Sequence, residues 1–379
     1  MISKRLFFLF LITLSCVSPD RSLIEIDPRT FIENKITLSE IADQISYLPL
    51  ESQYSLGVIP EMIITTKSIF VDSPEGIIVF NREGKMARKI GNKGRGPGEY
   101  LWSGSFTVDD ISETIYVMDK GNIIKVYSGS GNFLRSIPLQ KYGGDFQKAI
   151  MYFNSKLFIP EFNNMGRSKY NWIITDTLGT LFQQKENSLP AFSINLGNWG
   201  GTFKFDNRIT YWDFYSDTIF SILPDLSYNP SFVFTQGEHR LPKLKINPSQ
   251  FSKYVFPYSI FETNRFIVMT YFFKKNCIAL IEKNSKKSFL FNQGEDNKGG
   301  ILNDLDGGTR FVPQKYYKEK GREYLIEFLN PFQLKAYVAS ADFKHSDAKF
   351  PEKKEELVKL ANAVKVTDNP VLMIVRLKK

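Results

Sequence analysis

A repeated pattern of strands and turns is the feature that most constrains how this 379-residue chain folds. Two segments align well, IFVDSPEGIIVFNREGKMARKIG from Ile69 and IYVMDKGNIIKVYSGSGNFLRSI from Ile115. Each has three runs rich in β-branched and aromatic residues, separated by turns that contain Gly with Asp or Asn. Their spacing of about 46 residues is typical of propeller blades, each of which is a small antiparallel sheet of four strands.

Further copies of the pattern are weaker but keep the same order of strands. They are KLFIPEF, RITYWDF, RFIVMTYFF and REYLIEFL, which begin at Lys156, Arg208, Arg265 and Arg322. The last copy has no outer strand, because the chain ends soon after PVLMIVRL at Pro370. ISYLPL at Ile45 is a strand-like run without a partner, so we expect it to supply the missing strand and remove an exposed edge. The sequence therefore predicts an all-β fold, a six-bladed β-propeller closed by an N-terminal strand.

The final copy is interrupted by an insertion, residues 330–368, between its second and third strands. Within it, Pro351 suits the first turn of a helix, and an apolar stripe follows at Leu357, Leu360, Ala361 and Val364. We predict a short helix whose stripe is covered. Two roles are open, a lid over the mouth of the central channel and a packing buttress. We expect residues 45–379, insertion included, to form a single propeller domain.

Residues 1–16 have the layout of a bacterial export signal. A basic start precedes the apolar run LFFLFLITL, which is too short to span a bilayer comfortably. Cys16 then occupies the position at which a bacterial lipoprotein is acylated, although Thr13 and Leu14 depart from the usual residues. An ordinary cleaved signal with an incidental cysteine is the alternative. We expect a lipid anchor at Cys16 in the bacterial cell envelope, on the outer membrane facing the periplasm or the surface, followed by a lead-in, residues 17–44.

Charge and cysteine content exclude some classes of function. The formal net charge is +9, from 49 basic and 40 acidic residues, but the basic residues are spread along the chain, whereas nucleic-acid-binding proteins concentrate theirs. We therefore expect no nucleic-acid partner. Besides Cys16 the chain has one cysteine, Cys277. An intramolecular disulfide is not expected, and the apolar neighbours of Cys277 indicate a buried thiol.

The string KIGNKGRGPGEY, from Lys89 to Tyr100, predicts an irregular loop between two blades. Its glycines permit positive φ angles, and Pro97 fixes its own φ. A phosphate-binding loop is the alternative interpretation. A Walker motif, however, requires Lys and then Ser or Thr at the start of a helix, and here Gly98 is followed by Glu-Tyr-Leu-Trp.

With this string, the sequence resembles a known family, the bacterial six-bladed β-propeller lipoproteins related to NHL-repeat proteins. Further stretches similar to that family are LSEIADQISYLPLE (38–51), SDTIFSI (216–222), LNDLDGGTRFVP (302–313) and NPVLMIVRLK (369–378). The resemblance extends from about residue 24 to the end of the chain. It implies an exported propeller and, for most members, no established biochemical activity.

One face of the propeller is expected to carry the candidate binding residues. In each blade, the loop that enters the first strand and the turn between the second and third strands lie at the same end. Propellers generally bind ligands on that face or in the channel. The candidate residues there are Arg95, Glu99, Tyr100, Asp119, Asn122 and Asp217. We interpret them as contacts for a polar or anionic ligand, either protein or carbohydrate. The alternatives are turn capping by the Asp side chains and a local ion pair between Arg95 and Glu99.

Catalytic and metal chemistry find little support, and we assign no catalytic residue. The two histidines, His239 and His345, are too few for a zinc site even with one cysteine, and no nucleophile elbow is present. Asn303, Asp304 and Asp306 could contribute to a calcium site of the kind found in lactonase-type propellers. We favour a turn for these residues, and expect no other cofactor.

The leading hypothesis is a non-catalytic binding or scaffolding module at the bacterial envelope. The alternative is a calcium-dependent hydrolase or lyase of the lactonase-like propeller type. The lining of the central channel distinguishes the two. Carboxylates and amides that converge on one point favour the enzyme, and an aromatic or mixed lining favours binding.

Overall fold

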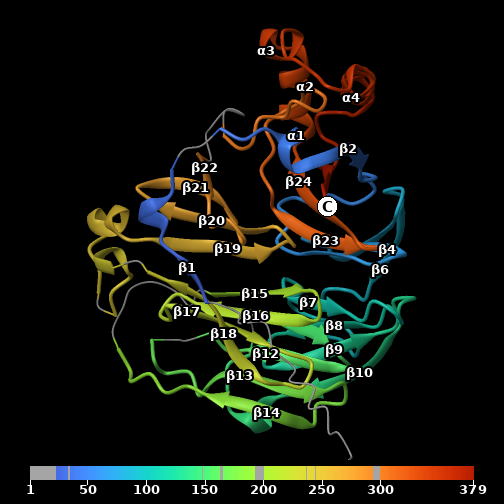
Figure 1. Ribbon diagram of the computed structural model, residues 1–379. Helices are drawn as coiled ribbons and strands as arrows, with labels where there is room; N and C mark the ends of the chain where they lie inside the picture. Colours follow the sequence, from blue (N-terminus) through green and yellow to red (C-terminus); the bar gives the residue numbers. More distant parts are fainter. Residues whose placement is uncertain are drawn as a thin grey trace, which may run out of the picture.

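The computed structural model describes residues 23–32, 35–146, 148–162, 165–192, 200–235, 237–243, 245–292 and 299–379. Within these residues, six sheets, antiparallel apart from one added parallel strand, surround a central channel (Figure 1), which confirms the predicted six-bladed β-propeller.

The first three blades follow the chain from the inner to the outer strand. Blade 1 consists of β3 (Met62–Ile64), β4 (Ser68–Ser73), β5 (Gly76–Asn81) and β6 (Met86–Ile90). Blade 2 consists of β7 (Phe106–Val108), β8 (Ile115–Asp119), β9 (Ile123–Tyr127) and β10 (Phe133–Pro138). Blade 3 consists of β11 (Met151–Phe153), β12 (Lys156–Pro160), β13 (Tyr170–Asp176) and β14 (Leu181–Glu186).

The remaining blades keep this order, and the last takes its outer strand from the N-terminal side. Blade 4 contains β15 (Gly200–Phe205), β16 (Arg208–Asp213), β17 (Thr218–Ile222) and β18 (Tyr228–Phe234). Blade 5 contains β19 (Phe256–Glu262), β20 (Phe266–Phe273), β21 (Lys275–Glu282) and β22 (Ser288–Asn292). Blade 6 contains β23 (Lys315–Glu319), β24 (Arg322–Leu329), β25 (Val371–Leu377) and β2 (Ala42–Pro49). Short 3-10 helices lie in the connections, at Pro28–Thr30, Gln140–Tyr142, Gly237–His239 and Pro248–Lys253.

The middle strands of a blade are buried because neighbouring blades pack against both of their faces. The sequences of β4 (SIFVDS) and β5 (GIIVFN) are rich in β-branched and aromatic residues and are buried along nearly their whole length. Such side chains suit a pleated surface that is covered on both sides. The outer strand β14 (LFQQKE) is largely exposed, because one of its edges faces solvent.

The N-terminal strand β2 closes the ring, as predicted. It pairs antiparallel with β25, with Ile45 opposite Val375 and Pro49 opposite Val371. Because β25 also pairs with β24, β25 is an interior strand and its edge is covered. The strand begins at Ala42, slightly earlier than the ISYLPL run.

The lead-in before β2 also joins the sheets, which the sequence did not indicate. Strand β1 (Ile24–Ile26) pairs in parallel with β18 and gives blade 4 a fifth strand. The chain then passes blade 5, where the backbone N–H of Leu290 donates to the carbonyl oxygen of Ile32 at 3.3 Å. It continues through helix α1 (Leu38–Ile41) directly into β2. The lead-in therefore connects blades 4, 5 and 6 along their outer strands.

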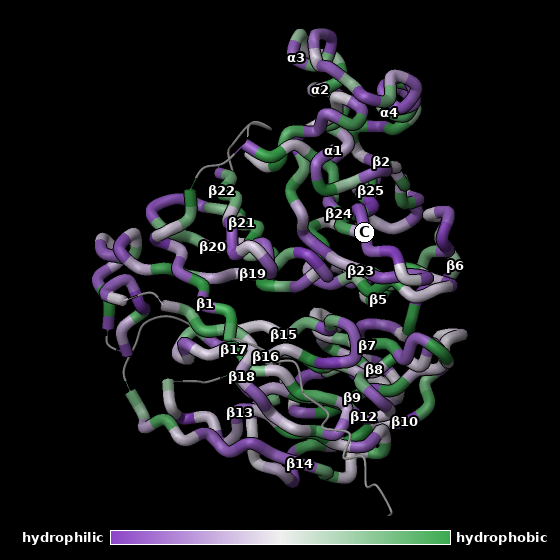
Figure 2. Tube along the Cα trace, viewed as in Figure 1, coloured by the Kyte–Doolittle hydropathy of each residue, from purple (hydrophilic) through white to green (hydrophobic). Residues whose placement is uncertain are grey.

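The insertion in blade 6 contains helices α2 (Pro331–Ala339), α3 (Ala341–Lys344) and α4 (Pro351–Ala363). Helix α4 is the predicted helix, with Leu357 and Ala361 of the stripe buried. The other two helices were not predicted. In Figure 1 the three helices stand beyond the outer strand β2, away from the inner strands, and Figure 2 shows hydrophobic and hydrophilic residues mixed along them.

The two faces of the disc are named here by their connections. The loop face carries the loops that enter the first strands and the turns between second and third strands, and the turn face carries the others.

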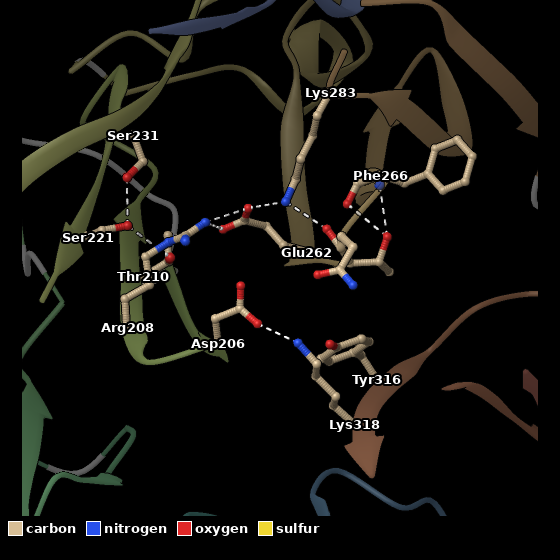
Figure 3. Close-up of polar contacts among 12 residues, drawn as sticks. Asp206, Arg208, Thr210, Ser221, Ser231, Glu262, Phe266, Lys283, Tyr316 and Lys318 are labelled. Atoms are coloured by element: carbon tan, nitrogen blue, oxygen red, sulfur yellow. Dashed lines mark hydrogen bonds and ion pairs between the residues drawn. The ribbon is translucent and has the colours of Figure 1, made fainter. Parts of the chain in front are cut away.

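On the turn face, Arg208 donates to both carboxylate oxygens of Glu262 at 2.8 Å, and the Nζ atom of Lys283 lies 2.6 Å from the same carboxylate. Figure 3 shows both cations directed at Glu262. The contact between Arg208 and Glu262 joins blade 4 to blade 5, and Lys283 supports Glu262 from within blade 5.

Candidate functional site

Tyr100 lies at the end of the glycine-rich loop between blades 1 and 2. Its side chain is fully buried. The hydroxyl donates to the carbonyl oxygen of Ile90 at 2.7 Å and accepts a hydrogen bond from the backbone N–H of Ile77 at 3.0 Å. Burial raises the pKa of Tyr100 to about 12. The side chain therefore connects the loop to blade 1 and is not exposed on the loop face, contrary to our expectation from the sequence.

The other two candidates in this loop behave differently from each other. The carboxylate of Glu99 accepts a hydrogen bond from the backbone N–H of Gly96 at 2.7 Å and so stabilises the loop from within. Arg95 is exposed. Within the described chain it forms no ion pair with Glu99, so the local pair considered as an alternative is not formed. Of the three loop candidates, Arg95 is thus the one whose side chain lies open on the loop face.

Asp119 and Asn122, in the turn between β8 and β9, hold neighbouring loops in place. Asp119 accepts hydrogen bonds from the backbone N–H groups of Leu101 and Trp102 at 2.8 and 3.1 Å. The amide oxygen of Asn122 accepts one from the N–H of Phe146 at 2.8 Å. Asp119 also accepts a hydrogen bond from the N–H of Lys120 in its own turn at 2.8 Å, which fits the turn-capping interpretation, whereas the other contacts hold the loops before and after blade 2.

Asp119 is one of a set of buried carboxylates that the sequence analysis did not recognise as a group. Each lies near the loop-face end of the second strand of its blade: Asp72, Asp119, Glu161, Asp213 and Glu327. The N–H of Asp145 donates to Glu161 at 3.1 Å and that of Val312 to Glu327 at 2.8 Å, from the loops that enter those blades. A sequence signal was present, because KLFIPEF, RITYWDF and REYLIEF each place an acidic residue before Phe at the same position.

Glu327 has the most unusual environment for a carboxyl group in this set. Burial raises its pKa to about 8, and the hydrogen bond from the Val312 N–H opposes that shift only in part. At neutral pH Glu327 is therefore mostly protonated in the folded chain. Burial likewise raises the pKa of Asp213, which accepts a hydrogen bond from the N–H of Tyr215 at 2.8 Å.

The possible calcium ligands form a structural turn. The Asn303 amide donates to Asp306 Oδ1 at 2.6 Å, and the Tyr47 hydroxyl donates to Asp306 Oδ2 at 2.7 Å. Asp304 instead accepts hydrogen bonds from the N–H and hydroxyl of Ser39, at 2.8 and 2.6 Å. The side chains thus belong to two separate groups with donors from the chain itself, and they do not fit a calcium site. Within the described residues, no three His, Cys, Asp or Glu side chains are placed to hold a metal ion.

This turn supports the helical insertion. The N–H of Lys349 donates to the carbonyl oxygen of Asp304 at 3.0 Å, and that of Phe350 donates to Leu305 at 2.8 Å. Leu357 of α4 is buried in the same hydrophobic core as Leu305. The described lining of the central channel includes no residue of the insertion. The insertion therefore has the contacts of a packing buttress, the second of the two roles considered.

The inner strands of all six blades line a central channel with a volume of about 670 Å³. Its lining is mixed. It includes aliphatic and aromatic side chains, such as Ile63 and Tyr152, together with charged ones. Towards the loop face, Lys315 pairs with Glu61 at 2.8 Å, and Lys148, from the loop before β11, also lines the channel. In the described lining, carboxylates do not converge on one point.

Ion pairs between blades that are not neighbours lie at the turn-face end of the channel. The Nζ atom of Lys318 in blade 6 lies 2.6 Å from the carboxylate of Asp206 in blade 4 (Figure 3). Lys204 of blade 4 lies 3.3 Å from Asp110 of blade 2. The side chains are partly exposed, so each pair alone contributes little to stability. Together they occupy this end of the channel.

A second cavity, a cleft of about 520 Å³, lies between blades 3 and 4. It contains Asp217, the sequence candidate in the turn between β16 and β17. The carboxylate of Asp217 lies 2.7 Å from Arg240 Nε. Burial raises the pKa of Asp217, while Arg240 and Lys243 oppose the shift. The two cations come from the loop after blade 4, and the sequence analysis did not select them, because only the fold brings that loop beside Asp217.

The cleft also contains aromatic and hydroxyl groups. Tyr211, Tyr215, Phe220 and Tyr228 contribute to its lining. Phe220 and Tyr228 are stacked, with ring centroids 4.3 Å apart. Asp217 is the one sequence candidate in this cleft. Arg95, Asp119 and Asn122 lie at the connections of blades 1 to 3, so the structure does not bring the candidates together in one site.

The predicted leader and Cys16 lie outside the described residues, so the lipid anchor stays a prediction. Across the described part of the chain, every helix is too short or too polar to span a membrane. Cys277 is buried in β21, as expected.

Comparison with known proteins gives a family and a fold. The family described as "Domain of unknown function (DUF4934)" matches residues 23–376. A "Putative exported protein" from Bacteroides fragilis is 18% identical, with a TM-score of 0.67, over 94% of this chain and 100% of that one. A member of the duf4221 family from Bacteroides vulgatus is 12% identical, with a TM-score of 0.49, over 89% and 97% of the two chains. The first similarity shows a shared fold. No curated protein sequence is significantly similar to this one.

Proposed function

This chain belongs to the family described as a domain of unknown function, DUF4934, and from this premise we propose that it is an exported, lipid-anchored binding or scaffolding module of the bacterial envelope. The leader-like residues 1–16 support export, and Cys16 is the proposed point of acylation. The Bacteroides fragilis structure is likewise described as an exported protein. The relation to NHL-repeat lipoproteins and a place on the outer membrane belong to the same proposal.

The lining of the central channel is the observation that carries binding over catalysis. An enzyme of the calcium-dependent type needs several carboxylates or amides directed at one point. The described lining instead mixes lysines, hydroxyls, aromatic rings and aliphatic side chains, and Glu61 is paired with Lys315. Such a surface suits recognition of a ligand. The turn 302–308, the other place considered for calcium, is occupied by contacts within the chain.

Retention of envelope components by the immobilised mature protein, in detergent, tests this function. The loop-face variant Arg95→Glu, Lys243→Glu reverses two positive charges, and Lys67→Glu, Lys85→Glu is a matched turn-face control. All four side chains are at least partly exposed. We expect the loop-face variant to retain several-fold less of a specific component and the control to behave as wild type. If the wild-type protein retains nothing, the scaffolding role at the envelope is wrong; if the control alone loses retention, the loop face is the wrong surface.

A further inference from the structure

The cleft between blades 3 and 4 carries positive charge that the chain does not neutralise. Lys243 is partly buried and Lys185 is exposed at its edge, and within the described residues neither forms an ion pair. Arg240 is paired with Asp217 at 2.7 Å, and Asp213 also lines the cleft, so the lining has three cations against two carboxyl groups. Two unpaired cations in a concave site favour a ligand that carries negative charge.

Tyr215 adds an unused polar group to the same cleft. The residue lines the cleft and is 2% exposed. Its backbone N–H donates to Asp213 at 2.8 Å, but within the described structure its buried hydroxyl has no hydrogen-bond partner. Buried hydroxyl groups are nearly always paired in folded proteins, so an exception requires an explanation. Because the chain itself covers this hydroxyl, an oxygen of a bound ligand would supply the missing partner after a shift of the cleft wall.

The aromatic wall of the cleft indicates the body of that ligand. The Phe220 and Tyr228 rings are stacked at 4.3 Å with an angle of 14° between their planes, and both are partly exposed. Each ring covers one face of the other, and Lys185 and Trp172 also lie close to the Tyr228 ring, so the outer face of Phe220 is the apolar surface that the pair offers to a ligand. A sugar ring has a matching character, with an apolar face and polar edges. The cleft volume of about 520 Å³ lies within the usual range of small-ligand sites.

From these three observations we infer that the cleft between blades 3 and 4 binds an anionic carbohydrate, a sugar that carries a carboxylate. The sugar ring lies against the outer face of Phe220, which is backed by Tyr228, and the carboxylate is held by Lys185 and Lys243. A ring hydroxyl bonds to the Tyr215 hydroxyl. This inference rests on the proposed binding function and specifies one site and one class of ligand for it.

Calorimetric titration of the mature protein in detergent tests the ligand class. The probe is a disaccharide that contains glucuronic acid, and the controls are the matching disaccharide of glucose and acetate. We expect binding of the acidic disaccharide, and at least tenfold weaker binding of both controls. Equal binding of the neutral disaccharide would overturn the role of charge. Equal binding of acetate would overturn the role of the aromatic wall, and no binding of the acidic disaccharide would overturn the inference.

Variants locate the site. Lys185→Ala, Lys243→Ala is expected to weaken binding of the acidic disaccharide at least tenfold, whereas Lys67→Ala, Lys85→Ala leaves the affinity unchanged. Tyr215→Phe separates ligand binding from a structural role. It removes an unpaired buried hydroxyl, so we expect a higher melting temperature without ligand together with weaker binding. An unchanged affinity in both cleft variants would place the site elsewhere.

The outcomes for the cleft and for the proposed function can be told apart. The double lysine variant is also tested for retention of envelope components. If it retains them as the wild-type protein does, while an Arg95→Glu variant does not, the loop face binds a partner but the cleft does not. If the wild-type protein binds the acidic disaccharide yet retains nothing from the envelope, the cleft inference stands and the scaffolding role does not.

Discussion

The carboxylate of Glu262 accepts two hydrogen bonds from the guanidinium group of Arg208 in the neighbouring blade, each at 2.8 Å. Glu262 is 1% exposed, and Lys283 lies 2.6 Å away on another side. Burial lowers the pKa of Lys283, and the attraction of Glu262 opposes that shift. The two cations compensate this buried side chain for the contacts with water that it has lost. The pair therefore fixes blade 4 against blade 5.

We predict that Glu262→Gln lowers the free energy of unfolding by about 3 kcal/mol, because it leaves two partly buried cations without their carboxylate. Urea denaturation at pH 7 measures the change. The matched control is Glu356→Gln, which removes an exposed pair with Lys353 on α4 and should cost less than about 1 kcal/mol. Similar losses in the two variants would show that the buried pair has no special part in joining the blades.

Glu327 predicts a specific dependence of stability on pH. Its pKa is about 8 in the folded chain against an ordinary value of 4.5, so between these values the folded chain binds more protons than the unfolded chain. The contribution of this group to the free energy of unfolding is therefore at its full value below about pH 4.5, and it is lost as the pH rises from 4.5 to 8. The loss is about 1.4 kcal/mol for each pH unit of difference between the two pKa values, several kcal/mol in all.

Glu327→Gln isolates this effect, since glutamine is neutral and its oxygen can still accept the hydrogen bond from Val312. Melting temperatures of the two proteins are compared from pH 5 to pH 9. We expect the difference in melting temperature to change in favour of the variant as the pH rises, and to level off above about pH 8. A difference that does not vary with pH would mean that Glu327 ionises normally in the folded chain.

Because β2 closes the ring, we predict that a single substitution in this strand lowers the free energy of unfolding considerably. Ile45 is 1% exposed and belongs to the main hydrophobic core. Ile45→Ala should lower the free energy of unfolding by about 2–5 kcal/mol, the usual cost of such a truncation in a core. Ser46→Ala, at the adjacent exposed position of the same strand, should change it by less than about 0.5 kcal/mol. Equal, small changes would indicate that β2 is dispensable for the fold.

The strands were predictable from the sequence because each has a local signal. β4, β5 and β2 are runs of β-branched and aromatic residues between turn residues, and the repeat sets their order. Strand β1 has only three residues, and it exists because the edge of β18 is available to it. Helix α2 could have been predicted, since Asn330 caps it and Pro331 occupies its first turn.

The site was less predictable, because the partners of its side chains come from distant parts of the chain. Tyr100 in a glycine-rich loop looks the same in sequence whether its ring is exposed or buried. Its burial depends on Ile77 and Ile90, which blade 1 brings to its hydroxyl. Asp217 could be placed on the loop face from topology, whereas its pairing with Arg240 depends on the path of the loop after blade 4.

The hydrogen bonds of Tyr100 give a further prediction. Tyr100→Phe removes the hydroxyl that pairs the N–H of Ile77 and the carbonyl of Ile90. Leaving these buried groups unpaired should cost about 1–3 kcal/mol. Tyr258→Phe, in which the altered ring is 49% exposed, is the control and should be close to neutral. Urea denaturation measures the free energy of unfolding of both variants. A neutral effect of Tyr100→Phe would imply that water replaces the hydroxyl.

The proposed anchor predicts the behaviour of a variant at Cys16. If Cys16 is acylated, cells fed radioactive palmitate should label the protein, and it should partition into the detergent phase on phase separation. Cys16→Ser should abolish the label and release a water-soluble form, because the propeller no longer carries acyl chains, each buried CH₂ of which is worth about 0.8 kcal/mol. Cys277→Ser is the matched control and should keep the label, since Cys277 is buried within blade 5. A wild-type protein that is unlabelled and stays in the aqueous phase would rule out lipid attachment at Cys16 and leave an ordinary cleaved signal.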